Sequence, residues 1–385
     1  MSDDASKLRV GLVLDDGLDS PDGVQQYVLA MGEWLRDQGH EVLYLAGQTS
    51  RTDIEGVHSL SRNISVKSNG NYLTVPLPTS RKKLRNFLAE HQLDVLHVQT
   101  PYSPFMAGRL VQEASAQTAV VGTFHILPNS YLISLGTQLL GRWSRRSLRR
   151  FDKMLSVSPA AQVFARDKFG VESSVLPNVI DYERFRLAKP LVKYNDSTLT
   201  ILFLGRLVPR KGCHLLLEAV SELVNNHENL PAFRVVICGK GPLLHNLKRF
   251  VDERGLNDIV EFTGFVSEVD KPHYYAAANI SAFPSSGGES FGIVLLEAMA
   301  SGNSVVLAGD NAGYRSVMHE QPDLLFAPKD KLALADKLAL YLNDATKHQA
   351  MSQWGARYTA DFDVNKVGSK LVEIYREALR KRPKL

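Results

Sequence analysis

Short apolar segments recur along this chain, and each is followed by a polar loop and a helical pattern. The first series includes residues 8–14, 41–46 and 119–124, and a second series begins at 199–204 and 233–238. Continuous apolar runs of this length are typical of parallel strands that are buried on both faces. Strands that alternate with helices form βαβ units. The sequence therefore predicts an α/β protein with doubly wound parallel sheets.

Length and composition predict more than one domain in a globular protein. The chain has 385 residues, of which 44% are hydrophobic and 22% are charged. Domains typically hold about 100 to 200 residues, so this length favours two or three of them. A turn at Pro177 and Asn178 separates the two α/β series, and we expect the domain hinge there.

Several classes of protein are excluded by what the sequence lacks. Cys213 and Cys238 stand far apart in apolar segments, with neither metal-ligand nor disulfide spacing, as expected in a reducing cytosol. The chain starts with acidic residues and holds no run of eighteen apolar residues, so we expect neither export nor a membrane span. A net charge of +4 without a recognition motif predicts no nucleic-acid partner. We expect no metal site.

One stretch combines a flexible loop, a helix start and two carboxylates. Gly287 and Gly288 allow the backbone to approach a ligand, and a helical pattern follows from Phe291. The free N–H groups of a helix start suit a diphosphate. On one helix, Glu289 and Glu297 would lie about 12 Å and about 80° apart. This is too far for a glycosidase pair, at roughly 5 to 10 Å.

Two carboxylates at that separation suit two parts of one long ligand. We expect Glu289 to hold a transferred sugar and Glu297 to hold a ribose, because carboxylates accept hydrogen bonds from hydroxyls. The alternative is a solvated pair on an ordinary amphipathic helix.

Other candidates stand at the ends of predicted strands, where open α/β sheets bind ligands. Arg206 and Lys211 lie in the loop after residues 199–204, and their cationic groups suit a diphosphate. His125 follows residues 119–124, and Gly23 precedes a predicted helix. The exposed backbone near Phe265 is a candidate reader of a nucleotide base. For each, an ordinary structural or solvated role is the alternative.

A predicted helix at residues 80–91 is basic on one side and apolar on the other. Its cations are Arg81, Lys82, Lys83 and Arg85, and Leu84, Phe87 and Leu88 lie opposite. This pattern fits a helix at an anionic membrane surface, although a basic face is usually only solvated.

These segments together resemble the retaining glycosyltransferases of family 4, which have the GT-B fold. The resemblance covers nearly the full chain and rests on residues 123–125, 177–178, 205–212, 239–242, 262–265 and 287–297. It implies two Rossmann-like domains that face each other across a cleft, with the last helix crossing back to the first domain. Residues 1–176 and 363–385 would form the acceptor- and membrane-facing domain, and residues 177–362 would bind a nucleotide sugar.

The resemblance also implies roles for individual residues. His125, Glu289, Arg206 and Lys211 would be catalytic. The donor would contact Gly23, Arg206, Lys211, Gly239, Phe265, Val266, Glu289, Ser290, Phe291, Gly292, Ile293 and Glu297. The enzyme would bind no cofactor and no metal, and its nucleotide-sugar substrate would be GDP-mannose or UDP-glucose.

Within the family, the chain looks most like the phosphatidylinositol mannosyltransferases. This likeness implies a cytoplasmic enzyme, peripheral on the inner face of the cell membrane, that glycosylates a lipid or polyol acceptor. Asp22 replaces the first glycine of that group's glycine pair, and Asp15 and Asp16 stand where its acceptor pocket begins. Carboxylates there would repel a phosphate, which argues against phosphatidylinositol itself. The alternatives are a soluble transferase acting on a sugar, sugar phosphate or polysaccharide, and a non-catalytic nucleotide-sugar-binding protein.

Overall fold

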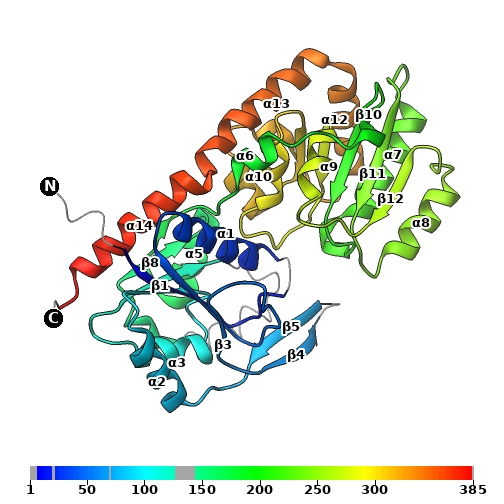
Figure 1. The fold of residues 1–385 in the computed structure, drawn as a ribbon. Coiled ribbons are helices and arrows are strands. Elements are labelled where there is room, and N and C mark those ends of the chain that lie inside the picture. Colours follow the sequence, from blue (N-terminus) through cyan, green and yellow to red (C-terminus); the bar gives the residue numbers. More distant parts are fainter. Residues whose placement is uncertain (1–6, 20–21, 69–70, 126–143, 384–385) are drawn as a thin grey trace. The chain divides into compact units, whose positions relative to one another are not determined.

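A computed structural model describes residues 7–19, 22–68, 71–125 and 144–383. The chain divides into two compact units (Figure 1). Unit 1 comprises Met1–Val179 together with Val364–Leu385, and unit 2 comprises Ile180–Asp363.

Unit 1 is built on a parallel sheet. Within the described residues this sheet has seven strands, in the order β3-β2-β1-β6-β7-β8-β9. Their bounds are β1 Arg9–Leu14, β2 Glu41–Ala46, β3 Val57–Ser59, β6 Val95–Gln99, β7 Ala119–Phe124, β8 Lys153–Ser156 and β9 Ser174–Val175. A separate antiparallel hairpin joins β4 Asn63–Ser68 to β5 Asn71–Pro76. The predicted parallel α/β sheet is confirmed.

Helices cover both faces of this sheet, as expected of a doubly wound unit. They are α1 Gly23–Asp37, α2 Arg81–His91, α3 Met106–Glu113, α5 Pro159–Phe169 and α14 Val364–Arg380, and residues 144–148 are also helical. Leu12 of β1 packs in one core with α1 and α14, whereas its neighbour Val13 packs in another with α2 and α3. Successive side chains of a strand point to opposite faces, so a continuous apolar run supplies both cores.

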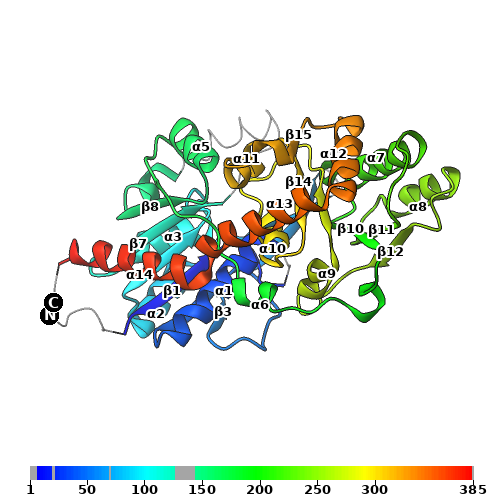
Figure 2. The ribbon, with the colours of Figure 1, turned by 90° about the horizontal axis from the view of Figure 1, so that it is seen from above.

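Helix α14 belongs to unit 1 and lies beside α1 (Figure 2). Trp34 of α1 donates from Nε1 to Oδ1 of Asn365 at 2.8 Å. A Cβ on Gly368 would lie 2.5 Å from the Trp34 ring, so only glycine allows this approach. At the other end of the helix, the Tyr375 hydroxyl lies 2.7 Å from Nδ1 of His97 on β6.

Unit 2, all of whose residues are described, holds a second parallel sheet. Its six strands have the order β12-β11-β10-β13-β14-β15. Their bounds are β10 Leu199–Leu204, β11 Phe233–Cys238, β12 Val260–Gly264, β13 Ile280–Phe283, β14 Val305–Gly309 and β15 Leu325–Phe326. The helices are α6 Tyr182–Arg186, α7 Cys213–Asn226, α8 Leu244–Glu253, α9 Lys271–Ala277, α10 Ile293–Ala300, α11 Ala312–Met318, α12 Lys331–Asn343 and α13 Ala345–Thr359.

The first and last residues of unit 2 are joined by backbone contacts. Ile180 donates from its N–H to the carbonyl of Phe362 at 3.1 Å and forms a parallel bridge with Asp363. The chain therefore enters and leaves unit 2 through two segments that pair with each other in this short parallel bridge. Strand β9, Ser174–Val175, runs into the turn predicted at Pro177 and Asn178, and the first segment of unit 1 ends at Val179.

Asp15, at the end of β1, is buried and holds the start of α3. Its carboxylate accepts a hydrogen bond from the Ala107 N–H at 2.8 Å and another from the Ser103 hydroxyl. Burial raises the pKa of Asp15 to about 6, against the opposing effect of these two bonds. Asp15 thus has a structural role at the start of α3. Asp16 is half-buried and accepts from the Gly17 N–H at 2.7 Å and from Gln25 Nε2 at 3.2 Å.

We predict that Asp15→Asn flattens the pH dependence of stability. The folded-state pKa of about 6 lies above the ordinary value of 3.8, so protonated Asp15 contributes stability that is complete below about pH 4 and is lost as the pH rises through about 6. The whole loss is about 3 kcal/mol, of which about 1 kcal/mol falls between pH 5 and pH 7. Urea unfolding of both proteins at these two pH values measures the difference. If the free energy of unfolding changes equally between pH 5 and pH 7 in both proteins, Asp15 is not the source of the pH dependence.

Candidate functional site

Three loops of unit 2 pack backbone against backbone at the carboxyl edge of its sheet. A Cβ on Gly212 would lie 2.1 Å from the Pro284 carbonyl oxygen, and one on Gly239 would lie 1.9 Å from that of Gly205. Gly212 and Gly239 also have positive φ angles of 73° and 153°. Glycine is therefore required where the loops after β10, β11 and β13 touch. Together these loops form one surface where open α/β sheets bind ligands, which we call the cradle.

Glu289 lies in the cradle and is held by two cations. Its Oε1 lies 2.5 Å from Arg210, 2.9 Å from Lys211 Nζ and 2.9 Å from the Ser285 hydroxyl. Burial alone would raise the pKa of Glu289, but Lys211 and Arg210 outweigh it and hold this pKa below the ordinary value. The carboxylate is thus ionised and fixed. The sequence analysis did not identify Arg210 as a partner of Glu289. The one available signal was its position next to Lys211.

The prediction that Glu289 and Glu297 share one helix is wrong. Helix α10 starts at Ile293 rather than Phe291, and Glu289 lies in the preceding loop. Gly292 has a φ of 122°, and a Cβ there would lie 2.7 Å from the Tyr314 ring, so the backbone turns sharply before the helix. The expected axial separation of the two carboxylates therefore does not apply. The loop is held in place by α11, since a Cβ on Gly313 would lie 2.1 Å from the Glu289 carbonyl oxygen.

Glu297 lies on α10 in a buried ion pair. Its Oε1 is 2.6 Å from Lys271 Nζ, and the two side chains are 4% and 6% exposed. Lys271 also lies 2.7 Å from Glu268, and the Tyr275 hydroxyl donates to Glu297 Oε2 at 3.4 Å. Burial would lower the pKa of Lys271, but Glu297 and Glu268 raise it above the ordinary value. The sequence analysis did not identify Lys271 as a site residue, because its partner Glu297 is 26 residues away and no local pattern links the two.

The other predicted donor residues of unit 2 lie around the same loops. Arg206 is exposed in the loop after β10, and Phe265 is 56% exposed with Lys240 Nζ 5.5 Å from its ring centre. Phe291 is buried against Phe362, with ring centres 5.9 Å apart. Val266, Ser290 and Ile293 are half-buried. Gly23, in unit 1, is exposed as the first residue of α1.

His125 follows β7 in unit 1 and is almost fully buried. Its Nε2 lies 2.6 Å from Oε1 of Gln99, the last residue of β6, and its ring centre lies 4.9 Å from that of Tyr27. Burial lowers the pKa of His125 to about 3, while the Asn178 side chain acts in the opposite direction. The imidazole is therefore neutral at pH 7. Gln99 was not identified, although its place at a strand end was an available signal.

The cations of the basic helix α2 are exposed to solvent, whereas its apolar residues pack toward the core of unit 1. Arg81 and Arg85 pair with Glu113 of α3 at 2.7 and 2.8 Å. Leu84 is fully buried, and Phe87 and Leu88 pack against the core. The expectation that an apolar side of this helix enters a membrane is therefore wrong. Lys82 and Lys83 are exposed.

Basic residues from three parts of the chain come together near the end of α3. Arg150 donates to the carbonyls of Ser115 and Thr118 at 2.6 and 2.9 Å, just beyond Glu113. Arg382, from the C-terminal segment, pairs with Asp152 and donates to the Arg150 carbonyl. We call this region the basic surface. Arg81, Arg85, Arg150 and Arg382 make these contacts, and their exposed neighbours in the sequence are Lys82, Lys83, Arg145, Arg146, Arg149, Arg380 and Lys381.

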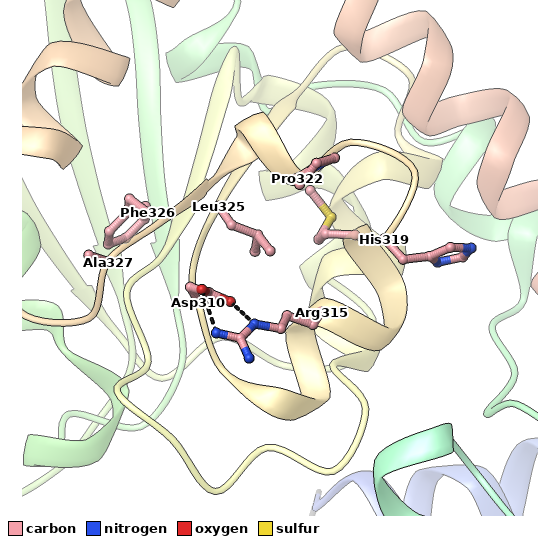
Figure 3. A pocket seen from close by; sticks show the side chains of 8 residues that line it. Asp310, Arg315, His319, Pro322, Leu325, Phe326 and Ala327 are labelled. Carbon is pink, nitrogen blue, oxygen red and sulfur yellow. Dashed lines mark hydrogen bonds and ion pairs between the residues drawn. The ribbon is translucent and has the colours of Figure 1, made fainter.

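A cavity of about 340 Å³ in unit 2 lies apart from these candidates. Met318, Leu325 and Phe326 form part of its wall, and Asp310 pairs with Arg315 beside it (Figure 3). His319 points away from this ion pair (Figure 3). None of the predicted site residues lines this cavity.

Two kinds of feature are absent from the described residues. Within that part of the chain, no three His, Cys, Asp or Glu side chains gather in a way that would hold a metal ion. No helix there is both long and apolar enough to cross a membrane.

Two family models match most of the chain. The model for Glycosyltransferase Family 4 matches residues 21–184, and that for Glycosyl transferases group 1 matches residues 188–357. A phosphatidyl-myo-inositol mannosyltransferase of Mycobacterium leprae is 30% identical over 374 residues, which cover 96% of each chain. A GDP-mannose-dependent alpha-(1-6)-phosphatidylinositol monomannoside mannosyltransferase of Mycobacterium tuberculosis is 26% identical over 388 residues, covering 96% of this chain and 98% of that protein.

Solved structures agree on the fold. A glycosyltransferase from Rickettsia africae has a TM-score of 0.75 at 16% identity and covers 97% of this chain and 99% of its own. Anabaena HepE in complex with UDP and glucose has a TM-score of 0.73 at 19% identity, covering 96% and 100%. From the two parallel-sheet units and the identity to mycobacterial mannosyltransferases over nearly the whole chain, we conclude that this protein is a glycosyltransferase of retaining family 4 with the GT-B fold.

Proposed function

We propose that this glycosyltransferase moves a hexose from a nucleotide sugar to a lipid-linked acceptor at an anionic membrane surface. The observation that carries the donor half is Glu289, ionised and held between Arg210 and Lys211 in the cradle. A fixed carboxylate suits sugar hydroxyls, and adjacent cations suit phosphate oxygens. No other described group in unit 2 combines these features beside the loops at its sheet edge.

The donor is proposed to be GDP-mannose or UDP-glucose. A relative from Mycobacterium tuberculosis is named as GDP-mannose-dependent, and the Anabaena structure holds UDP and glucose. The bond from the anomeric carbon to the diphosphate breaks while a bond to the acceptor oxygen forms. Arg206 and Lys211 stabilise the leaving diphosphate, each by on the order of a few kcal/mol. The acceptor proton passes to the leaving phosphate on the same face, which gives retention, and the proposal needs neither metal nor cofactor.

His125 is proposed to contact the sugar, and Glu297 is proposed to hold the ribose with Lys271. A neutral imidazole accepts or donates a hydrogen bond without repelling the positive charge that develops on the sugar ring. The buried Lys271–Glu297 pair fixes the carboxylate beside α10, in the same way that Arg210 and Lys211 fix Glu289.

The acceptor half of the proposal rests on the basic surface and on the named relatives. Phosphatidyl-myo-inositol mannosyltransferases act, by name, on a membrane lipid. Each Lys or Arg near an anionic leaflet adds roughly 1 kcal/mol of attraction. Asp15, Asp16 and Asp22 are carboxylates that oppose a phosphate at the acceptor, although Asp15 also caps α3.

A soluble acceptor is the second candidate. The observation that favours it is the packing of Leu84, Phe87 and Leu88 against the core of unit 1, which leaves α2 little apolar surface for a bilayer. Attraction to a membrane would then be electrostatic alone, and it would weaken with salt.

We predict that Glu289→Gln lowers the transfer rate by on the order of 100-fold or more, because it removes the fixed charge and leaves Arg210 and Lys211 without their partner. The assay offers GDP-mannose and UDP-glucose with anionic vesicles that carry a total lipid extract, and products are resolved by mass. Glu222→Gln, which breaks a surface pair with Lys331, is the matched control. Turnover unchanged in the Glu289 variant would contradict its assignment.

We predict that Lys271→Met weakens nucleotide binding and destabilises unit 2 by about 3 to 5 kcal/mol, since Glu297 is left buried without its cation. The double variant Lys271→Met/Glu297→Gln should recover stability but not nucleotide affinity. Thermal melting and calorimetric titration with GDP and UDP measure the two effects. Full recovery of affinity in the double variant would show that the pair is structural only.

We predict that Lys82→Glu/Lys83→Glu reduces co-sedimentation with anionic vesicles by at least 10-fold at low salt, because two attractive charges become repulsive. Arg249→Glu/Lys347→Glu, exposed cations of unit 2, is the matched control and should bind like the unchanged protein. Absence of vesicle binding by the unchanged protein would favour the soluble acceptor.

A further inference from the structure

Gln99 and His125 lie on the same face of neighbouring strands in unit 1. Gln99 is paired in register with Thr123, and His125 stands two residues beyond Thr123, so their side chains point to one side of the sheet. His125 Nε2 lies 2.6 Å from Gln99 Oε1, and the two residues are 3% and 0% exposed. Tyr27 of α1 covers the imidazole with ring centres 4.9 Å apart. This short buried contact fixes the plane of the ring.

Two buried polar atoms beside this contact are unpaired. Among the described residues, neither Gln99 Nε2 nor Asn178 Oδ1 has a hydrogen-bond partner. The Asn178 side chain lies within reach of the imidazole and raises its pKa against the effect of burial, although its Oδ1 makes no well-aligned hydrogen bond to the residues that the structure describes. Buried polar atoms are paired in the great majority of cases, and each unpaired one needs an explanation. A hydroxyl, which both donates and accepts, would satisfy atoms of these two kinds.

We propose that Gln99 is a positioning residue that holds His125 as its neutral Nε2–H tautomer and offers its own N–H₂ group to a hydroxyl of a bound sugar. The hydrogen bond made by one ring nitrogen decides the tautomer, so Nε2–H donating to Gln99 leaves Nδ1 as an acceptor. The inference rests on the proposed function, in which His125 contacts the sugar. The hydroxyl belongs either to the transferred hexose or to the acceptor, and the two sources share this chemistry.

An amide suits this position because it accepts a hydrogen bond without adding charge. A carboxylate in its place would favour the protonated imidazole. Gln99→Glu keeps the shape of the side chain and therefore tests the charge, whereas Gln99→Met keeps its length and removes both hydrogen-bonding atoms. Thr123→Val is the matched control, since Thr123 bonds His97 Nε2 at 2.7 Å on the same face and, within the part of the chain that the structure describes, makes no hydrogen bond to His125.

The first readout is the ¹⁵N NMR spectrum of the histidine-labelled full chain, in which His125 is assigned by its loss in His125→Asn. We expect the Nε2–H tautomer in the unchanged protein and in Thr123→Val, a mixture of tautomers in Gln99→Met, and a protonated imidazole in Gln99→Glu near neutral pH. An Nδ1–H tautomer in the unchanged protein, or the same tautomer in Gln99→Met, would overturn the proposal.

The second readout is transfer kinetics with the donor and acceptor varied in turn. Gln99→Met should lower kcat/KM by about 10- to 100-fold, the range seen when hydrogen-bond partners of metal-bound histidines are removed, and His125→Ala should add little in that background. If Gln99→Met raises the KM for the donor, the hydroxyl belongs to the transferred hexose. If it raises the KM for the acceptor, the hydroxyl belongs to the acceptor. Unchanged kcat/KM in both variants of Gln99 would overturn the proposal.

The two readouts separate this inference from the proposed function. If the unchanged protein transfers no sugar from any donor, the proposed function fails, while the NMR spectra still report whether Gln99 sets the His125 tautomer. If transfer occurs and the tautomer does not respond to Gln99, only the inference fails.

Discussion

The close packing of glycine backbones at the carboxyl edge of the second sheet is the constraint on which the proposed donor site depends. Gly212 lies against Pro284, Gly239 against Gly205, and Gly241 against Leu207, at distances that exclude any side chain. These contacts join loops from β10, β11 and β13 that are far apart in the sequence. Because the loops are fixed by one another, the cations of the first loop and the carboxylate of the third come within hydrogen-bonding distance. A ligand meets groups that are already in place, and preorganised charges of this kind account for much of enzymatic stabilisation.

Two carboxylates of this unit illustrate different balances between burial and pairing. Glu289 is held by Arg210, Lys211 and Ser285 through one oxygen, and its pKa stays below the ordinary value in spite of its burial. An ammonium has three donors, so Lys211 can contact Glu289 and a phosphate together. Glu297 instead forms a nearly solvent-free pair with Lys271. A buried pair of this kind contributes little net stability, yet loss of one partner is strongly destabilising, which makes such pairs suitable for fixing a side chain at one position.

Unit 1 differs from unit 2 because some of its hydrogen-bonded polar side chains are buried between the sheet and its covering helices, and others lie at the carboxyl edge of the sheet. His97 bonds both Tyr375 and Thr123, so a buried polar contact helps to attach α14, together with the Trp34 contacts to Asn365 and Gly368. The Asp15 carboxylate holds the start of α3. The basic surface, by contrast, gathers cations from three distant segments near Glu113 and Asp152, whose two negative charges offset only part of it. Long-range attraction to an anionic surface depends on this summed charge.

Periodicity and composition alone determined the fold class of this protein and the place of most strands. The predicted ranges 41–46, 119–124, 199–204 and 233–238 coincide with β2, β7, β10 and β11, because a strand buried on both faces must be apolar throughout. Helix α13 was not identified, since few of its residues are fully buried and it shows no clear apolar stripe. Only the tertiary structure decided that α10 starts at Ile293, where Gly292 has a φ of 122° and lies against the Tyr314 ring with no room for a side chain. It also brought Arg210 to Glu289, Lys271 to Glu297 and Gln99 to His125, pairs separated by 79, 26 and 26 residues. Local sequence records which groups a chain carries, whereas these partners meet only because parallel strands bring their carboxyl ends to one edge.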